Sequence, residues 1–312
     1  MALRLEEDVL LKNYCTFKVG GQAKHFVKVE TEADLREALQ LVAKEHWPLF
    51  ILAHGSNVIF PDEGWPGLVI LIGIKELKIE GQSLRAGAAN MMNELVDASI
   101  SNGLAGLEWA GGLPGTFGGA IRGNAGAFRG EMKDVIASVR SIETTTGREI
   151  ERKNDGAMFG YRDSIYKRHS EVIVSAAVEL RQGDQAELRA TADKWIAFRQ
   201  DRHPLEFPNV GSIFKNTPIG RVPENWMAHF HDFIKNDPFP IIPTGKIIDD
   251  AELKGFKIGQ AQVSEKHANY IVNLGGATSK DILGLIDHVK QVVRDKFQIE
   301  LDVEPEVVSS KE

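Results

Sequence analysis

Cysteine and long apolar runs are the scarcest features of this sequence. Only one of its 312 residues is a cysteine, Cys15, which excludes an internal disulfide and a zinc site built on cysteines. The longest apolar stretch, Leu68–Ile74, is far shorter than the roughly 20 residues of a membrane-spanning helix. The first ten residues lack the apolar run of a signal peptide. We therefore expect a cytoplasmic protein without membrane insertion.

Positive charge is also in short supply. Lysine and arginine total 37 against 44 aspartates and glutamates, which gives a formal net charge of −7 and a pI near 5.8. Binding to a phosphate backbone requires clustered positive charge, so a nucleic-acid partner is not expected. The apolar share of 43% and the charged share of 26% are typical of a folded globular protein.

Two common phosphate-binding signatures are missing. The sequence contains no G-x-x-x-x-G-K-[ST] segment, which excludes a P-loop, and no strand–G-x-G-x-x-G–helix unit, which argues against a Rossmann site. A metal site is not expected either. His267 has no second histidine at ligand spacing, and His229 and His231 lack further ligands.

Glycine, in contrast, is abundant and unevenly distributed. Ten of the 30 glycines lie between Gly103 and Gly130. Two segments, Ala53–Asn57 and Gly111–Ala120, offer backbone N–H groups with little side-chain obstruction, as in an anion-binding nest. Ser56, Asn57 and Thr116 add side-chain donors. The alternative is that both segments are only tight turns.

Three further segments carry candidate functional side chains. Arg162, next to Tyr161, could aim a guanidinium at a carboxylate, although a surface arginine in a hairpin has the same pattern. Ser212 follows Gly211 on an expected turn, with Lys215 and Asn216 close by in sequence; such a serine is more often structural. Glu304 and Glu306 end the last expected strand, where a solvated chain end is the simpler interpretation.

Periodicity predicts alternating helices and strands. The clearest signals are a helix with an N-terminal capping box at Thr31 and a helix over 279–296 with apolar residues on one face. The weakest boundary signal, near Gly183, separates predicted hairpins from a helix. The other expected elements are strands at 49–53, 68–74 and 299–303, a helix capped by Asn90 that stops at 102–103, hairpins over 147–180, a helix at 185–202 and an irregular excursion at 217–243.

Eight segments, in their order along the chain, carry a resemblance to a known family. They are Asn13–Gly21, Gly55–Asn57, Gly106–Ala120, Asn124–Gly126, Tyr161–Arg162, Gly211–Asn216, Lys266–Asn273 and Pro305–Val307. Together they resemble the UDP-N-acetylenolpyruvoylglucosamine reductase (MurB) family. The resemblance implies an α+β fold. An N-terminal FAD-binding region of the vanillyl-alcohol-oxidase (PCMH) type, residues 1–183, would precede a smaller α+β substrate domain, residues 184–312. The chain is similar to the shorter subtype that lacks an extra tyrosine-bearing loop.

The resemblance also implies the chemistry. NADPH would reduce non-covalently bound FAD, and the hydride would then reach the enolpyruvyl group of UDP-N-acetylglucosamine enolpyruvate. The product would be UDP-N-acetylmuramate, a peptidoglycan precursor, and the enzyme would act as a monomer. The implied cofactor-binding residues are His54, Gly55, Ser56, Asn57, Gly112, Gly115, Thr116, Gly119, Asn124, Ala125 and Gly126.

Three residues would carry out the chemistry with the substrate. Arg162 and Glu306 would stabilise charge on the substrate carboxylate, and Ser212 would protonate C2. Counting from Leu301 selects Glu304 instead of Glu306, and we prefer Glu306. The implied substrate-binding residues are Tyr161, Arg199, Arg202, Lys215 and Asn216.

Some positions depart from the family pattern. His54 replaces a common glycine, Arg122 stands before Asn124 where an apolar residue is usual, and the excursion at 217–243 is longer than the usual link. The departures at His54 and Arg122 leave open a nucleotide-sugar-binding protein that has lost its flavin. A second alternative is a flavin oxidase of the same cofactor-binding superfamily that uses oxygen.

Overall fold

The structure is a computed structural model that describes residues 3–309, and the chain forms two compact units. Unit 1 comprises residues 3–9, 23–54 and 66–199, and unit 2 comprises residues 10–22, 55–65 and 200–309. The chain therefore passes between the units several times. The division into domains at residues 1–183 and 184–312 stays a prediction.

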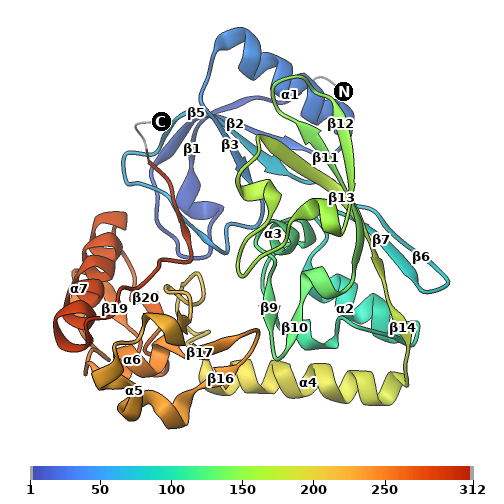
Figure 1. The fold of residues 1–312 in the computed structure, drawn as a ribbon. Coiled ribbons are helices and arrows are strands. Elements are labelled where there is room, and N and C mark those ends of the chain that lie inside the picture. Colours follow the sequence, from blue (N-terminus) through green and yellow to red (C-terminus); the bar gives the residue numbers. More distant parts are fainter. Residues whose placement is uncertain (1–2, 310–312) are drawn as a thin grey trace. The chain divides into compact units, whose positions relative to one another are not determined.

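Unit 1 is built on two sheets, whose strands are visible in Figure 1. All neighbours in the five-stranded sheet are antiparallel, whereas β3 and β5 of the four-stranded sheet pair in parallel. The five-stranded sheet has the order β12 (Glu149–Lys153), β11 (Ile136–Glu143), β13 (Glu171–Glu179), β7 (Ser83–Gly87) and β6 (Leu77–Glu80). The four-stranded sheet has the order β1 (Glu6–Leu10), β2 (Gln22–Val29), β5 (Trp65–Ile72) and β3 (Leu49–Leu52).

Helix α1 (Glu32–Glu45) begins at the predicted cap. The Thr31 side chain accepts a hydrogen bond from Asp34 N, and the Asp34 carboxylate accepts one from Thr31 N, so both members of the capping box are present. Leu35, Ala38 and Leu39 are buried on one face, as the 3.6-residue period requires.

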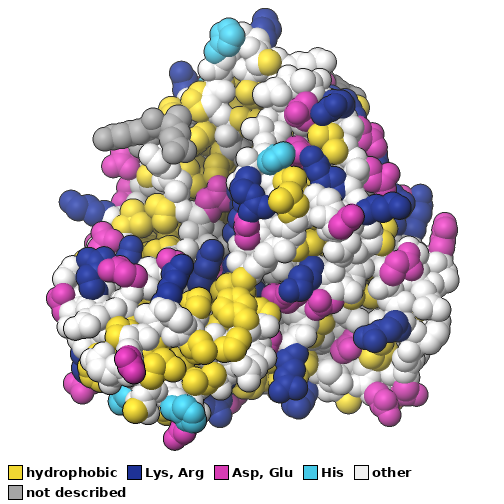
Figure 2. All heavy atoms as spheres, viewed as in Figure 1, with side chains coloured by type: hydrophobic (Ala, Val, Ile, Leu, Met, Phe, Trp, Pro, Cys, Tyr) yellow, Lys and Arg dark blue, Asp and Glu magenta, His cyan; other side chains and the backbone are white. Residues whose placement is uncertain are grey.

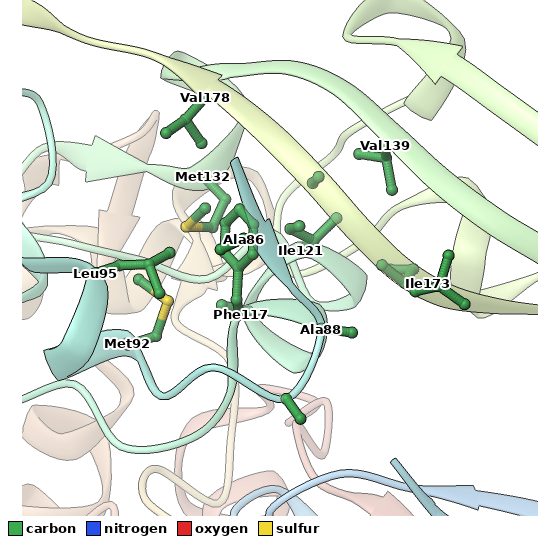
Figure 3. Packing of buried hydrophobic residues seen from close by; sticks show 14 of the residues in the cluster. Ala86, Ala88, Met92, Leu95, Phe117, Ile121, Met132, Val139, Ile173 and Val178 are labelled. Atoms are coloured by element: carbon green, nitrogen blue, oxygen red, sulfur yellow. The ribbon is translucent and has the colours of Figure 1, made fainter. Parts of the chain in front are cut away.

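Part of the core of unit 1 lies between the five-stranded sheet and two helices, α2 (Met92–Ser101) and α3 (Phe117–Arg122), and the same core includes side chains of α1 and of the four-stranded sheet. Figure 3 shows the side chain of Phe117 lying near Met92 and Leu95 of α2 and below Ala86 of β7. Phe117 is fully buried. This packing fixes α3, and with it the glycine-rich segment that precedes it.

Two predictions about unit 1 need correction. Asn90 is not the cap of α2, because the helix begins after Met91 and the Asn90 side chain instead accepts from Glu76 N and donates to Glu94. The hairpin prediction over 147–180 holds only at its ends. β12 and β13 both pair with β11, and the residues between them form the 3₁₀ turns η4 (Asp155–Ala157) and η5 (Ile165–Lys167).

The remaining elements of unit 1 are short, except for α4 (Gln185–Arg202), which matches the predicted helix at 185–202. In Figure 1, α4 runs beside the small β9–β10 hairpin. The short elements are β8 (Leu104–Ala105) paired with β14 (Arg181–Gln182), β9 (Gly126–Ala127) paired with β10 (Gly130–Glu131), η2 (Glu108–Ala110) and η3 (Met132–Asp134).

Unit 2 packs its core around α7 (Ser279–Phe297), close to the predicted 279–296. Ile282, Leu285, Ile286 and Val289 face that core. The Asp62 carboxylate accepts from Ser279 N and Lys280 N at 2.8 and 3.1 Å, which adds a negative charge at the N-terminus of the helix. The other elements of unit 2 are η1 (Leu11–Asn13), α6 (Thr244–Asp250), the sheet β18 (Lys257–Ile258), β19 (Ala261–Val263) and β20 (Ile271–Asn273), and the parallel pair β4 (Val58–Ile59) and β21 (Glu306–Val307).

The irregular excursion at 217–243 contains structure of its own. A three-stranded sheet and helix α5 lie within it, and Phe230 of α5 is fully buried in the core of unit 2. The strand predicted at 299–303 is wrong, since within the described chain only Val303 makes an isolated bridge there, to Phe214. The elements of the excursion are β15 (Thr217–Pro218), η6 (Ile219–Arg221), α5 (Glu224–Phe230), η7 (His231–Phe233), β16 (Lys235–Asn236) and β17 (Pro240–Ile242).

Candidate functional site

The loop Gly55–Asn57 in unit 2 offers three successive backbone donors. Gly55 has φ +67°, and a Cβ there would lie 2.2 Å from the carbonyl oxygen of Tyr14, so only glycine fits. Among residues 3–309, no group accepts a hydrogen bond from the N–H groups of Gly55, Ser56 or Asn57. The preceding His54 is exposed. The loop therefore has the donor set of an anion nest.

The C-terminal carboxylates lie beside this loop. Glu306 N donates to Asn57 O at 3.0 Å in the parallel β4–β21 pair, and the Asn57 side chain reaches Glu304 O at 3.5 Å. Glu306 is exposed and Glu304 is half-buried. Both side chains thus belong to one short segment, and the choice between them stays a prediction.

Ser212 lies on a turn that leads into the same region of unit 2. Gly211 has φ +83° with open space at its missing Cβ, and Gly211 N donates to the Asn209 side chain at 2.9 Å. Glu304 N donates to Ile213 O at 2.9 Å, which brings the predicted acid and the predicted carboxylates together. Within the described part of the chain, the Ser212 hydroxyl has no hydrogen-bond partner, so it can serve a ligand.

Thr16 is a connecting residue that the sequence did not single out. Thr16 N donates to Gly55 O at 3.0 Å, and its hydroxyl donates to Asn209 O at 2.6 Å. It therefore ties the Gly55 loop to the Ser212 turn within unit 2. The position of Thr16 within the Asn13–Gly21 segment was the one sequence signal that could have pointed to it. Nothing in that segment indicates that its hydrogen-bond partner lies 193 residues away.

The predicted substrate-binding residues of unit 2 differ in setting. Lys215 and Asn216 are half-buried, and both are anchored to Thr244 at the start of α6: Thr244 Oγ1 donates to Lys215 O at 2.7 Å and Thr244 N donates to the Asn216 side chain at 3.2 Å. Arg202 is exposed and pairs with its neighbour Asp201 at 2.8 Å. Lys215 and Asn216 thus lie on a fixed backbone, whereas the contact of Arg202 with Asp201 lies on the surface.

A half-buried aromatic cluster lies next to Ser212 in unit 2. Ser212 pairs with Tyr270 in an antiparallel bridge, and the Tyr270 hydroxyl lies 3.1 Å from His203 Nδ1. The ring of His267 lies 4.9 Å from that of Tyr270. Burial lowers the pKa of His267, so the imidazole is neutral at pH 7. The structure thus places His267 in the packing behind the serine turn.

Unit 1 offers a second donor set in the segment Gly111–Ala120. Gly112 and Gly115 have φ +71° and +104°. Among residues 3–309, no acceptor lies on the N–H groups of Gly112, Gly115 or Thr116, although Gly115 and Thr116 are buried. A buried donor without an acceptor costs about 1–3 kcal/mol, so a bound anion would recover this energy.

The glycines of α3 serve two different purposes. A Cβ at Gly118 would lie 2.8 Å from Ala88 Cβ, so this glycine allows the helix to pack on the core. Gly119 is exposed, and a Cβ there would meet only Thr116 Oγ1 at 3.5 Å and Ala53 Cβ at 3.9 Å. Gly119 therefore leaves open surface beside the donors of Gly115 and Thr116.

The loops Asn124–Gly126 and Tyr161–Arg162 are joined by hydrogen bonds in unit 1. Asn124 Nδ2 donates to Gly160 O at 2.8 Å, and Arg162 Nη2 donates to Gly126 O at 2.8 Å. The Arg162 guanidinium also lies 5.2 Å from the centre of the Tyr161 ring. Asn124 is fully buried and its Oδ1 accepts from Lys133 N, so its side chain holds the loop in place.

Arg199 lies at the end of unit 1 and is 8% exposed. Its Nε donates to Gly111 O at 2.9 Å, and its guanidinium carbon lies 5.1 Å from the centre of the Phe128 ring. The predicted role of Arg199 in substrate binding is not tested by these contacts, but they attach it to the glycine-rich segment.

Each of these donor sets, taken by itself, fits an anionic group such as a phosphate. The N–H groups of Gly55–Asn57 in unit 2, and those of Gly112, Gly115 and Thr116 in unit 1, each suit the oxygens of such a group, and neither set depends on a Rossmann glycine pattern. Over residues 3–309, no cluster of three or more His, Cys, Asp or Glu side chains could hold a metal ion. No helix in this range is long and apolar enough to span a bilayer.

Two parts of the chain match known families. Residues 23–151 match the profile of an FAD binding domain, and residues 203–308 match that of the C-terminal domain of UDP-N-acetylenolpyruvoylglucosamine reductase. The predicted α+β fold, with an FAD-binding region ahead of a MurB-type domain, is confirmed.

Proteins that are similar to this chain over nearly its whole length are named as the same reductase. UDP-N-acetylenolpyruvoylglucosamine reductase of Clostridium novyi is 33% identical over 308 residues, covering 98% of this chain and 93% of that protein. The enzyme of Lactobacillus delbrueckii is 34% identical, covering 99% of this chain and 97% of that protein. The crystal structure of MurB from Thermus caldophilus superposes with a TM-score of 0.79 at 30% identity, over 98% of this chain and 100% of that one.

Proposed function

The chain belongs to the UDP-N-acetylenolpyruvoylglucosamine reductase family, and we propose from this membership that it reduces UDP-N-acetylglucosamine enolpyruvate to UDP-N-acetylmuramate, a peptidoglycan precursor, with NADPH. The observation that carries the proposal is the donor set at Gly112–Thr116 of unit 1, which suits a phosphate of FAD in a chain without a Rossmann fingerprint; the loop Gly55–Asn57 of unit 2 offers a second set of the same kind. When bound, FAD supplies hydride transfer between NADPH and the substrate.

We propose that FAD binds without a covalent tether. Cys15 is buried and its Sγ donates to Val19 O, so it is not presented to a ligand. Burial also raises the pKa of this thiol, which keeps it protonated and unreactive. The residues proposed to bind FAD are His54, Gly55, Ser56, Asn57, Gly112, Gly115, Thr116, Gly119, Asn124, Ala125 and Gly126.

Arg162 and Glu306 act on the charge that forms in the substrate. Addition of hydride at C3 of the enolpyruvyl group moves the C2–C3 electron pair onto C2, and the charge spreads into the adjacent carboxylate. Arg162, fixed by its bond to Gly126 O, neutralises that charge, and Glu306 acts on the same substrate carboxylate. Each is expected to matter most in the step that reduces the substrate.

Ser212 supplies the proton that C2 then requires. Its hydroxyl has no partner within residues 3–309, and the bonds of the adjacent Gly211 N and Ile213 O fix the turn that carries it. A serine is a weak acid, but the developing carbanion is a strong base, so proton transfer needs only correct geometry. The hydroxyl oxygen keeps the electron pair of the broken O–H bond and is reprotonated from solvent.

Substrate binding is assigned to Tyr161, Arg199, Arg202, Lys215 and Asn216. Positive charge on Arg199, Arg202 and Lys215 suits the diphosphate of the UDP-sugar. We further propose a cytoplasmic monomer that does not bind nucleic acid. In support, acidic and basic side chains are interspersed on the face shown in Figure 2, and the net charge is −7.

The position of the active carboxylate can be tested by a matched pair of variants. We expect Glu306→Gln to slow substrate reduction by about 10²–10³ and to leave flavin reduction by NADPH nearly unchanged, whereas Glu304→Gln affects both only slightly. Stopped-flow absorbance follows the two half-reactions separately. The reverse result, with Glu304→Gln damaging and Glu306→Gln mild, would transfer the role to Glu304.

A further inference from the structure

A two-residue turn joins β9 to β10, and both of its residues have positive φ. Phe128 and Arg129 have φ +53° and +68°, between the paired residues Ala127 and Gly130. This geometry suits a type I′ hairpin turn, which normally uses asparagine or glycine at these positions. A bulky residue in this region costs about 1 kcal/mol or more, so surrounding contacts must hold the turn.

Contacts with α4 hold this turn. The Phe128 ring stacks on Trp195 with 3.8 Å between ring centres and an interplanar angle of 9°. The guanidinium carbon of Arg199 lies 5.1 Å from the centre of the same ring, and Phe198 makes an edge contact at 5.3 Å. Stacking and cation–π contacts of this kind compensate the backbone strain.

The same face of α4 holds the start of the other glycine-rich segment. A Cβ at Gly111 would lie 2.4 Å from Ala192 O, so this glycine allows the segment to approach the helix backbone. Arg199 Nε donates to Gly111 O at 2.9 Å. Ala192, Trp195 and Arg199 follow each other at helical spacing, and Arg199 contacts both Gly111 and Phe128.

Both segments attached to α4 continue directly into predicted FAD-binding residues. Gly111 precedes Gly112 and the donors of Gly115 and Thr116. Phe128 ends the loop that contains Gly126, whose carbonyl accepts from Arg162 at 2.8 Å. A shift of either segment on α4 would therefore move donors that the cofactor needs.

We propose that Phe128 and Arg199 are positioning residues for FAD, and that they lock the Gly111–Thr116 and Asn124–Gly126 segments onto α4 in the binding conformation. This inference rests on the proposed use of FAD. Preorganisation of this kind raises affinity, because the ordering cost is met on folding rather than on binding. Arg199 thereby acts on the cofactor through Gly111 and Phe128.

The test measures FAD affinity instead of turnover. FAD is removed from the purified protein and titrated back, with flavin fluorescence as the signal, and the melting temperature of the flavin-free protein is recorded in parallel. The variants are Phe128→Ala, Phe128→Tyr, Arg199→Ala and Arg199→Lys, and the double variant of the two alanines. Asp193→Ala, on the exposed side of α4, is the matched control.

We expect Phe128→Ala and Arg199→Ala each to weaken FAD binding by about tenfold, the loss that corresponds to one aromatic or cation–π contact. Phe128→Tyr keeps the ring and should rescue affinity, Arg199→Lys should be intermediate, and Asp193→Ala should match the wild type. The double variant should lose less than the product of the single losses, because one contact connects the two residues.

Two results would overturn the inference while leaving the proposed function intact. One is unchanged FAD affinity in Phe128→Ala and Arg199→Ala together with a lower melting temperature, which is the signature of a purely structural contact. The other is a double variant whose loss of FAD affinity equals the product of the two single losses, because the two residues would then act independently. A wild-type protein that binds no FAD would contradict the proposed function itself.

Discussion

The proposed role of Ser212 is restricted to one step of the reaction, the protonation of C2. Its job begins only after hydride has reached C3, so Ser212→Ala should leave FAD binding and flavin reduction by NADPH nearly intact. Single-turnover reduction of the enolpyruvyl substrate should fall severely, because the turn presents no other hydroxyl at this position. Ser212→Cys should retain more activity than Ser212→Ala, since a thiol still carries a transferable proton.

A structural role for Ser212 makes a different prediction. If the serine only shapes the turn at Gly211, its replacement by alanine should slow both half-reactions slightly and lower the melting temperature. Substrate reduction by Ser212→Ala at nearly the wild-type rate would eliminate the proton-donor role.

Gly118 and Gly119 are neighbours that should respond differently to one added methyl group. Gly118→Ala places a Cβ 2.8 Å from Ala88 Cβ, so the melting temperature should fall. The free energy of unfolding should decrease by about 1–3 kcal/mol, the usual cost of adding a methyl group to a packed core. Gly119→Ala meets only ordinary contacts and should keep the fold, but its methyl group should reduce FAD affinity. Calorimetry and FAD titration measure the two effects; equal FAD affinity in Gly119→Ala and the wild type would place the cofactor elsewhere.

At this scale, the sequence located segments more reliably than side-chain partners. The nest of backbone donors at Gly55–Asn57 could be anticipated, because glycine and small polar residues indicate exposed N–H groups. The use of the Asn124 side chain as a brace to Gly160 could not, and neither could the link from Thr16 to Asn209, because these pairs are 36 and 193 residues apart.

The N-terminus of helix α7 is stabilised both by its own capping box and by a carboxylate from a distant part of the chain. Thr278→Ala removes the cap that accepts from Asp281 N, and it should lower the free energy of unfolding by about 1 kcal/mol. Denaturant unfolding, with Thr31→Ala at the matched capping box of α1 as the comparison, measures the loss. No loss in Thr278→Ala would mean that the contacts of Asp62 with Ser279 N and Lys280 N hold this terminus without the cap.

Tyr166, in the 3₁₀ turn η5, should make the folded protein less stable at alkaline pH. Burial raises the pKa of Tyr166 to about 12, from 10.0 when unfolded. Between these values the unfolded chain has released this proton and the folded protein has not, so stability falls as the pH rises from 10 towards 12. The loss should reach about 2–3 kcal/mol by the top of that range.

Tyr166→Phe isolates this contribution, because the variant keeps the buried ring and removes the titrating group. Urea unfolding at several pH values between 9 and 12 should give a shallower decline for the variant than for the wild type. Parallel declines would mean that Tyr166 ionises in the folded protein as readily as in the unfolded chain.

Elements with strong periodicity could be predicted, and short ones could not. α1 and α7 each have a capping box and apolar spacing over three turns or more, which determine a helix locally. Helix α3 is only six residues long and contains two glycines, so packing of Phe117 in the core determines it instead of helix propensity. The strand expected at 299–303 failed because its pairing is limited to one bridge, between Val303 and Phe214, and alternation of side chains does not determine how far a pairing extends.

On the scale of the whole molecule, the order of motifs along the chain is the informative feature. Each segment alone has a structural explanation, but their sequence from Asn13 to Val307 matches relatives over 98% or more of this chain. The assignment of segments to units could not be read from the same order. Residues 10–22 and 55–65 belong to unit 2 although they are separated from its main body by more than a hundred residues.

Single-turnover reduction under anaerobic conditions tests the central claim most directly. The purified protein is reduced with one equivalent of NADPH, and UDP-N-acetylglucosamine enolpyruvate is then added while the flavin absorbance and the mass of the nucleotide sugar are followed. The account predicts that the absorbance recovers and that UDP-N-acetylmuramate forms in equal amount. Recovery only on admission of oxygen, without UDP-N-acetylmuramate, would identify a flavin oxidase, and the absence of any flavin absorbance would identify a binding protein; either result would contradict the account.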